Sequence, residues 1–459
     1  MTVGSSEALY IRIDRELQGH VPSDPLSCCI FKVPNHLRKV KEKAYEPQVI
    51  SIGPYHRGKD HLKAMEVHKK HYLKMLLDRN KEKTLKEYVE ALEGLKEKAL
   101  KFYSEPPYQR DGEDQFVEMM LFDGCFVVEF IRKIVEPGFR EKKDHLLADF
   151  ILITIVRDML LIENQLPFFI LIELFDKSKM PNEADQNFMH MAIDYLNRVM
   201  PEGFGNCNGK INDPAGKHLL GLLHDCCVSA DYGGSSKEDE GISAEEDRGS
   251  FVRYSPLKRF KLFLLAIMEG DKEKNYNRRN IGSASELHEA GIKFEKSKGR
   301  IFDMKFEKGV MSIPTLKIDD HTESTLRNLV AYEQCYKDIT SRHFTDYIRF
   351  MDYLINTGKD VELLCHSEVI ENMLGDNAVV AEIFNRISDN VLIDEENFYA
   401  KKFRDVNKHC KKNWNRWIAN LKHNYFNTPW AWISFVAAVF LLLLTVMQTV
   451  YSALGYHQQ

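Results

Sequence analysis

The feature that most constrains this chain is an uncharged apolar run near its carboxyl end. Residues 431–453 read AWISFVAAVFLLLLTVMQTVYSA and contain no Asp, Glu, Lys, Arg or His. At about 1.5 Å of rise per residue such a helix is roughly 35 Å long, enough to cross a hydrocarbon core of about 30 Å. Trp430, Trp432 and Tyr451 lie at its ends, where membrane proteins place amphipathic rings. The sequence therefore predicts a transmembrane helix over 429–454 with these three membrane-interface residues. The alternative is a buried core helix, which usually carries a charged edge.

A strongly basic stretch precedes this run. Residues 401–422 contain eight Lys or Arg and one Asp, a local charge of +7. Phe403, Val406, Cys410, Trp414 and Trp417 recur at three- and four-residue steps, which indicates one apolar stripe on a helix. We expect a basic amphipathic helix over 401–428 on an anionic membrane surface, with lipid as its partner. Packing of the stripe on the protein's own core is the open alternative. The expected membrane-surface residues are Lys401, Lys402, Arg404, Lys408, Lys411, Lys412, Arg416, Trp414 and Trp417.

The position of the basic stretch also predicts an orientation. The amino-terminal residues are polar and show no signal-peptide pattern, and Lys and Arg flank membrane spans on the cytosolic side. We therefore expect a single-pass, tail-anchored membrane protein whose large domain faces the cytosol. The sequence does not distinguish the plasma membrane from the endoplasmic reticulum.

The rest of the chain has the composition of a globular protein. Its 459 residues are 44% hydrophobic and 29% charged, which excludes wholesale disorder, and the length favours two or three packed units. Periodicity predicts helices nearly everywhere, and the segments 116–135 and 146–163 are apolar on almost every side, as in the centre of a bundle. The predicted fold class is therefore mainly α, a multi-helix globular domain with a small β meander and one carboxyl-terminal transmembrane helix.

A Gly-, Ser- and acid-rich stretch divides the chain. It predicts a linker at 229–250 between two helical lobes. The expected divisions are a flexible amino terminus (1–27), the first helical lobe (28–228), the linker (229–250) and the second helical lobe (251–400). The basic helix (401–428) and the membrane span (429–454) follow.

One β-rich region interrupts the second lobe. Apolar and polar residues alternate over 292–298, 301–307 and 310–318, with Gly299-Arg300 and Lys308-Gly309 between them. This pattern predicts a three-stranded antiparallel meander over 292–318. Beyond it, the sequence predicts a further helix over 361–373.

No established catalytic motif is present. The chain has no GxSxG, P-loop, nucleotide-binding GxGxxG or HExxH pattern, so we predict no catalytic residue and no cofactor. The six residues Cys207, His218, His224, Asp225, Cys226 and Cys227 cluster without matching a common zinc spacing, so no metal site is predicted. Nine Cys without regular spacing are typical of reduced thiols. With 63 Lys and Arg against 68 Asp and Glu, nucleic acid is not an expected partner.

Polar residues within apolar segments are the candidates for a site. A buried carboxylate is costly without partners, so these groups should be paired or hydrogen-bonded. The preferred hypothesis is a structural network in which Arg157 and Arg327 neutralise the acids. The alternative is a cavity lined by carboxylates that binds a metal or protonates a substrate. The expected members are Asp123, Glu129, Arg157, Asp158, Glu163, Asn164, Gln165, Arg327 and Glu333.

Several of these segments resemble a known family. The stretches VPNHLRKVKEKAYEPQVISIGPYH, MMLFDGCFVVEFI, RDMLLIENQLPFFIL, SASELHEAGIKF and RNLVAYEQC begin at residues 33, 119, 157, 283 and 327. Together they resemble the plant DUF247 family, also called UPF0481, over nearly the whole chain. The resemblance implies a helical plant protein with a carboxyl-terminal membrane helix and brings no active site. Some grass members are implicated in pollen self-incompatibility, which suggests recognition.

Two functions stay open at this point. The first is a membrane-anchored recognition or signalling protein that binds another protein, its own kind included. The second is an enzyme that uses a carboxylate-lined helical cavity on a lipophilic substrate. A structure separates them, because the second requires an enclosed pocket above about 300 Å³ with acids facing into it.

Overall fold

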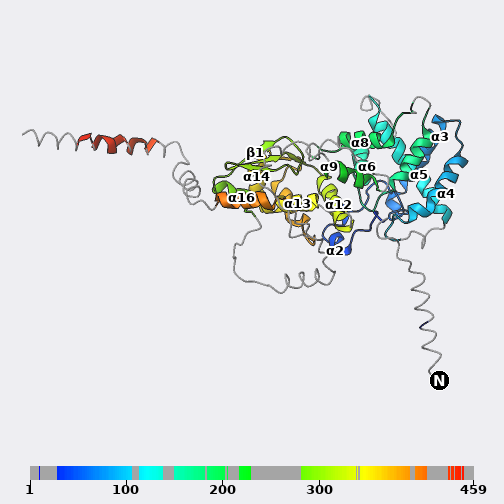
Figure 1. Cartoon of the computed structure of the whole chain (residues 1–459), viewed down its shortest axis with the longest axis horizontal. Coiled ribbons are helices and arrows are strands. Elements are labelled where there is room, and N and C mark those ends of the chain that lie inside the picture. The colour runs from blue at the N-terminus through cyan, green and yellow to red at the C-terminus, as the bar shows by residue number, and fades with distance from the viewer. Residues whose placement is uncertain are drawn as a thin grey trace, which may run out of the picture.

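Helices dominate the computed structural model of this chain (Figure 1). The structure describes residues 10, 28–105, 113–137, 149–180, 183, 185–201, 204, 217–228, 281–336, 339, 342–392, 398–410, 433–434, 436–438, 440–445 and 447–448. The predicted linker at 229–250 lies outside these residues, as does the predicted flexible amino terminus apart from Tyr10.

The amino-terminal half is a group of helices around α5. Two short 3-10 helices, η1 (Glu42–Ala44) and η2 (Asp60–Leu62), lie in the segment that precedes them. The α-helices are α2 (Asn35–Arg38), α3 (Ala64–Arg79), α4 (Leu85–Leu100), α5 (Glu113–Val135), α6 (Asp149–Asp158), α7 (Phe168–Ser178), α8 (Phe188–Val199) and α9 (Leu219–Val228).

Helix α5 is central because its side chains are apolar on nearly every side. It packs against α3, α4, α7 and α8. Its fully buried residues include Phe126, Val128 and Ile131. At Gly124 a Cβ atom would lie 2.3 Å from Leu174 Cδ1, so a glycine lets α7 approach closely. Burial on all faces is what an apolar helix without a polar side requires.

The carboxyl-terminal half is arranged around α12 (Thr322–Cys335). Every residue from Ser324 to Glu333 is buried. Helix α12 contacts α13 and α15 of its own half and also α9 and η1 of the other half. The remaining helices are α11 (Ala284–Glu289), α13 (His343–Leu354), α14 (Gly358–His366), α15 (Asn377–Ile387) and α16 (Ala400–Cys410).

Two small sheets lie beside these helices. The three-stranded sheet has the order β1-β3-β2, with β1 (Lys293–Ser297) parallel to β3 (Val310–Pro314) and β2 (Lys305–Glu307) antiparallel to it. The second sheet pairs β4 (Leu316–Ile318) with β5 (Ile370–Asn372) in parallel.

The predicted antiparallel meander over 292–318 is therefore wrong. Only β2 and β3 form a hairpin, through Lys308 and Gly309, whose φ values of 49° and 84° suit a two-residue turn. Between β1 and β2 the side chains of Ile301, Phe302 and Met304 are buried in the core. This buried connection carries the chain to the far edge of β3, so β1 and β2 do not pair and the sheet is mixed.

Two predicted helices are also shorter than expected. Helix α6 ends at Asp158, and the backbone from 161 to 167 is irregular although the segment is apolar. A helix was also predicted over 361–373. In the structure α14 ends at His366, and the later part of that range contains the strand β5. Glu368 has a φ of 56°, which ends the helical path between the two elements.

The predicted transmembrane helix over 429–454 is the main correction. Across all the residues that the structure describes, no helix has both the length and the apolar character needed to cross a bilayer. The transmembrane, single-pass and tail-anchored predictions are therefore wrong, and with them the membrane-anchored localisation from which the orientation was derived. Trp430, Trp432 and Tyr451 lie outside the described residues.

Candidate functional site

An irregular segment passes through the protein core. Residues 28–63 contain only three short helices, yet Ile30, Ile50 and Ile52 are almost completely buried. Irregular backbone in an interior leaves N–H groups that no helix or strand pairs, and each needs an acceptor. The acceptors come largely from residues 158–164 and from α5.

Asp158 is the main acceptor at the end of α6. Its Oδ2 atom accepts from the backbone N–H groups of Gln48, Val49 and Ile50 at 2.9, 2.7 and 3.1 Å. Arg157 Nη1 donates to Asp158 Oδ1 at 2.7 Å. Burial raises the pKa of Asp158, and these donors act against that rise. The carboxylate therefore holds three successive backbone groups of the irregular segment.

Arg157 secures the same segment from its other side. Its two terminal nitrogens donate to the backbone oxygens of Glu46 and Lys43 at 2.9 and 2.8 Å. The guanidinium thus joins a neighbouring carboxylate to two carbonyl groups. The predicted partnership of Arg157 with an acid is present in the structure, and that acid is Asp158.

Glu163 lies in a second charged group. Its Oε1 accepts from the backbone of Val33 at 2.6 Å, and its Oε2 pairs with Arg38 and lies 3.3 Å from His56 Nε2. Burial acts to raise the pKa of Glu163, but the bonds from His56 and Arg38 hold it below its usual value. Glu46 lies on the other side of His56, at 3.6 Å from Nδ1.

Asn164 and Gln165 bind backbone groups with both ends of their amides. Asn164 accepts from Ile52 at 2.6 Å and donates to the carbonyls of Ile50 and Asp158 at 3.0 and 2.9 Å. Gln165 donates to the carbonyl groups of Met159 and Leu161 at 2.7 and 2.8 Å. These bonds replace the helical pairing that ends at Asp158.

Asp123 on α5 pairs with a buried lysine. Lys69 Nζ lies 2.7 Å from Asp123 Oδ1, and Gly53 donates its N–H to Oδ2 at 2.9 Å. Lys69 also donates to Ser51 Oγ and Glu66 at 3.3 and 2.6 Å. Burial raises the pKa of Asp123, and the Lys69 ammonium opposes that rise.

The other predicted residues lie in separate places. Glu129 on α5 is fully buried between Arg132 and Arg79, whose Nη2 lies 2.6 Å from its Oε2. Arg327 on α12 pairs with Glu323 at 2.8 Å rather than with any predicted acid. Glu333, also on α12, lies 3.0 Å from His224. The structure therefore brings together Asp158, Asn164 and their neighbours, while Glu129, Arg327 and Glu333 serve other contacts.

Family comparison identifies what kind of chain carries this arrangement. The model of DUF247, described as plant protein of unknown function, matches residues 30–444. The chain belongs to the DUF247 family. The protein named UPF0481 protein At3g47200 from Arabidopsis thaliana is 32% identical over 440 residues, covering 94% of this chain and 87% of that protein. Putative UPF0481 protein At3g02645 from the same plant is 25% identical over 503 residues, covering 95% and 92%. No solved structure matches significantly.

The segments that carry the DUF247 resemblance meet in this polar arrangement. Residues 33–56 supply the backbone donors, 157–171 supply Asp158 to Gln165, and 119–131 supply Asp123. The segment 327–335 joins them through Asn328, whose side chain accepts from Ile162 N at 3.0 Å and donates to Ala44 O at 2.9 Å. Four of the five quoted stretches thus contact one another.

A small cavity lies beside the amides. Its volume is about 10 Å³, which holds about one water molecule. No carboxylate lines it. The lining residues are Ile52, Val127, Met159, Asn164, Gln165, Leu166, Leu171 and Leu219.

Sequence reasoning missed several cations and amides of this DUF247 chain. Lys69, Arg38, His56 and Asn328 all contact the irregular segment or its acids. For Lys69 a signal existed, because it lies on the same helical face as Met65, Tyr72 and Leu76, which are buried. A lysine at a core position of an amphipathic helix indicates a buried acid nearby.

Among the residues that the structure describes, the thiols and the histidine cluster show no ligand arrangement. The described residues include eight of the nine cysteines, and burial raises the pKa of the Cys28 thiol to about 11. Within the same residues no group of three or more His, Cys, Asp or Glu side chains is placed to hold a metal ion. Cys207 lies outside the described part.

The predicted basic helix is described only over α16. Phe403 and Val406 are buried, and the Phe403 ring lies 6.0 Å from that of Phe350, so this part of the stripe packs on the protein's own core. Lys401, Arg404 and Lys408 are exposed, and Lys402 Nζ lies 5.1 Å from the Phe398 ring. The other members, Lys411, Lys412, Trp414, Arg416 and Trp417, lie outside the described residues.

Proposed function

We propose that this DUF247 chain acts in recognition, by binding other proteins, and not by catalysis. The observation that carries the proposal is the orientation of the buried acids. Asp158 accepts from three backbone N–H groups and from Arg157, and Asp123 accepts from Gly53 and pairs with Lys69. A carboxylate whose lone pairs already accept internal bonds is poorly suited to bind a metal or to transfer a proton to a substrate.

The cavity supports the same proposal. Ligand pockets usually enclose about 300–1,000 Å³, whereas the cavity beside Asn164 and Gln165 holds about 10 Å³. The enzyme hypothesis required Asp123, Asp158 or Glu163 to face an enclosed pocket, and none of them lines this one. These acids instead give the irregular segment a fixed shape, as a binding scaffold needs.

Exposed apolar side chains provide a surface for a partner. Five consecutive residues, 440–444, are helical and are 47–66% exposed. They lie apart from the two helical groups (Figure 1). Consecutive helical residues point about 100° apart, so these five surround the helix with apolar surface. A contiguous exposed apolar surface marks an interaction site, and we propose that a protein partner covers it.

Proximity labelling in plant cells tests the proposal. The full chain carries a biotin ligase at its amino terminus, and Leu441→Gln/Leu444→Gln alters the exposed helix while Leu85→Gln is the matched control. Leu85 is 47% exposed on α4, so its replacement is chemically equivalent but lies elsewhere. We expect a specific set of labelled proteins that the double variant loses and the control retains.

Two results would contradict the proposal. The first is a labelled set that is the same for the wild type, the double variant and the free ligase. The second is turnover of a small molecule that Glu163→Gln abolishes without lowering the unfolding temperature, because that would make the acid part of a working site.

A further inference from the structure

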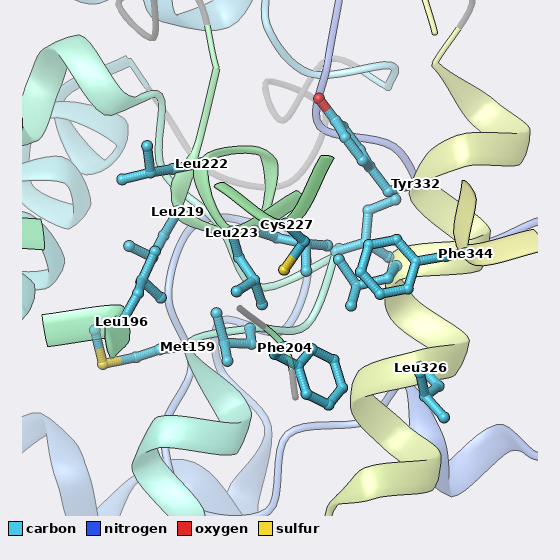
Figure 2. Close-up of a cluster of buried hydrophobic side chains, with 14 of the residues drawn as sticks. Met159, Leu196, Phe204, Leu219, Leu222, Leu223, Cys227, Leu326, Tyr332 and Phe344 are labelled. Carbon is cyan, nitrogen blue, oxygen red and sulfur yellow. The ribbon is translucent and has the colours of Figure 1, made fainter. Parts of the chain in front are cut away.

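A histidine links the two halves of the chain. His224 on α9 is 4% exposed, and its Nε2 lies 3.0 Å from Glu333 Oε1 on α12. Its Nδ1 lies 3.4 Å from Asp225 Oδ1. Around this contact, Leu219, Leu223 and Cys227 of α9 belong to one apolar cluster with side chains of α12 and α13 (Figure 2).

Glu333 connects the histidine to the beginning of α13. Its Oε1 accepts from the backbone N–H of Phe344 at 2.9 Å. Its Oε2 accepts from the N–H and the hydroxyl of Thr345, both at 2.8 Å. The first N–H groups of a helix have no partner within the helix, and a carboxylate satisfies them well. The fully buried Glu333 carboxylate therefore contacts α9 and accepts hydrogen bonds from the first turn of α13.

The charges at this junction balance when His224 is protonated. The two negative groups are the carboxylates of Asp225 and Glu333. The two positive groups are the Lys217 ammonium, whose Nζ lies 2.7 Å from Asp225 Oδ2, and the His224 imidazolium, which contacts Glu333. Burial acts to lower the pKa of His224, but its bonds to Asp225 and Glu333 raise it above the usual value. Loss of this proton leaves one negative charge uncompensated in the interior.

Two further histidines lie near this junction, His218 directly before α9 and His343 at the start of α13. His218 donates from Nε2 to Cys29 O at 3.0 Å and accepts at Nδ1 from Gly221 at 3.2 Å, and burial lowers its pKa to about 4. From α12 the ring of Tyr332 packs on His224. Helix α8 also contacts α9, and its buried residues are Phe188, Ala192, Tyr195 and Leu196; burial raises the pKa of that tyrosine.

We propose that His224 is a proton-sensitive latch that fastens α9 to α12 and to the first turn of α13 when protonated and loosens this junction on alkalinisation. The proposal does not depend on the proposed binding function. The latch contributes its full stability below the ordinary histidine pKa of about 6.5 and loses it as the pH rises through the raised value in the folded state.

Hydrogen exchange on the full chain measures the latch directly. Amides of α9 and the N–H groups of Phe344 and Thr345 should lose protection as the pH is raised above about 6.5, after correction for intrinsic exchange. One bound proton limits the loss to at most tenfold per pH unit. His224→Gln should remove this pH dependence, because glutamine keeps a donor but cannot be charged. His218→Gln is the matched control, because the His218 ring also packs on Tyr332, and the protection of this variant should follow the wild-type pH profile.

Direct titration keeps the proposal testable if His224→Gln does not fold. In wild-type chain with ¹³C-labelled histidine, the resonance that shifts in Asp225→Asn reports His224. The latch is supported if the His224 titration midpoint lies above that of free histidine and is lower in Asp225→Asn than in the wild type. A midpoint at or below the free value, or equal pH dependence of exchange in the wild type and His224→Gln, would overturn it.

Discussion

Replacing Asp158 by asparagine is the sharpest test of the polar network, because it changes charge and leaves size unchanged. Asparagine keeps one acceptor oxygen but puts an NH₂ group in place of the other. If the oxygen stays toward Val49 and Ile50, the NH₂ group faces Arg157 Nη1, which the carboxylate now holds at 2.7 Å. The buried guanidinium then loses its counter-charge, and two donors oppose each other.

The size of the effect follows from these contacts. Removing one partner of a buried ion pair costs about 3–5 kcal/mol, because the other charge stays in the interior. Arg157 keeps its bonds to the carbonyl groups of Glu46 and Lys43, which favours the lower end of this range. At roughly 1 °C per kcal/mol for a chain of 459 residues, the unfolding temperature should fall by about 3–5 °C.

Calorimetry on the full chain at neutral pH measures this shift. Asp194→Asn is the matched control, since the Asp194 carboxylate is 46% exposed and pairs with Arg198 on the surface of α8, so its loss should change stability by less than about 0.5 kcal/mol. An unfolding temperature of Asp158→Asn within 2 °C of the control would refute the structural role of the carboxylate.

Three further perturbations test the same network. Lys69→Met leaves the buried Asp123 carboxylate without its cation and should lower stability by about 3–5 kcal/mol in urea unfolding. Glu163→Gln should reduce the loss of folding stability at acid pH. Because the pKa of the Glu163 carboxyl is lowered in the folded state, its contribution to stability is present above about pH 4.5 and is lost as the pH falls through the folded-state pKa. Gly53→Ala should destabilise by at least about 1–3 kcal/mol, because φ is +77° and the new Cβ would lie 2.5 Å from a backbone oxygen.

Each of these has a control within the chain. Lys70→Met alters the adjacent, exposed lysine of α3, and equal destabilisation by both would show that the buried pair is not responsible. Gly58→Ala shares a positive φ of +83° but has open space around the new Cβ, so it isolates the backbone cost of about 1–2 kcal/mol. A wild-type loss of stability at acid pH in Glu163→Gln would assign that loss to other groups.

The hydrophobic pattern of the sequence was sufficient to predict buried helices. It was insufficient where contacts between distant segments determine the backbone conformation. The run 116–135 lies within α5 because a helix apolar on every side has only the core to occupy. The run 146–163 was equally apolar, but its last turn is replaced by side-chain bonds of Asn164 and Gln165 to backbone carbonyls. Periodicity detects burial and does not detect such competition for backbone groups.

Strand pairing was unpredictable for a similar reason. Alternation over 310–318 marks alternate burial, but it does not show that Thr315 lies between β3 and β4, which belong to different sheets. The partner of β4 is β5, more than fifty residues later, in a segment with helical periodicity. Parallel pairing between distant segments leaves no local turn signal of the kind that marked Lys308 and Gly309.

The polar network explains how a segment without regular structure holds a single conformation. Apolar burial of Ile50 and Ile52 is non-directional and would tolerate several backbone paths. Asp158 and Asn164 accept from the N–H groups of residues 48–50 and 52, and these bonds have fixed directions and lengths. Another path would leave buried carboxylate and N–H groups unpaired, at a cost of several kcal/mol. Selection among paths therefore comes from the polar groups. Asp123, Asp158 and Glu163, which sequence reasoning placed in a candidate site, fix the path of the backbone within residues 28–63.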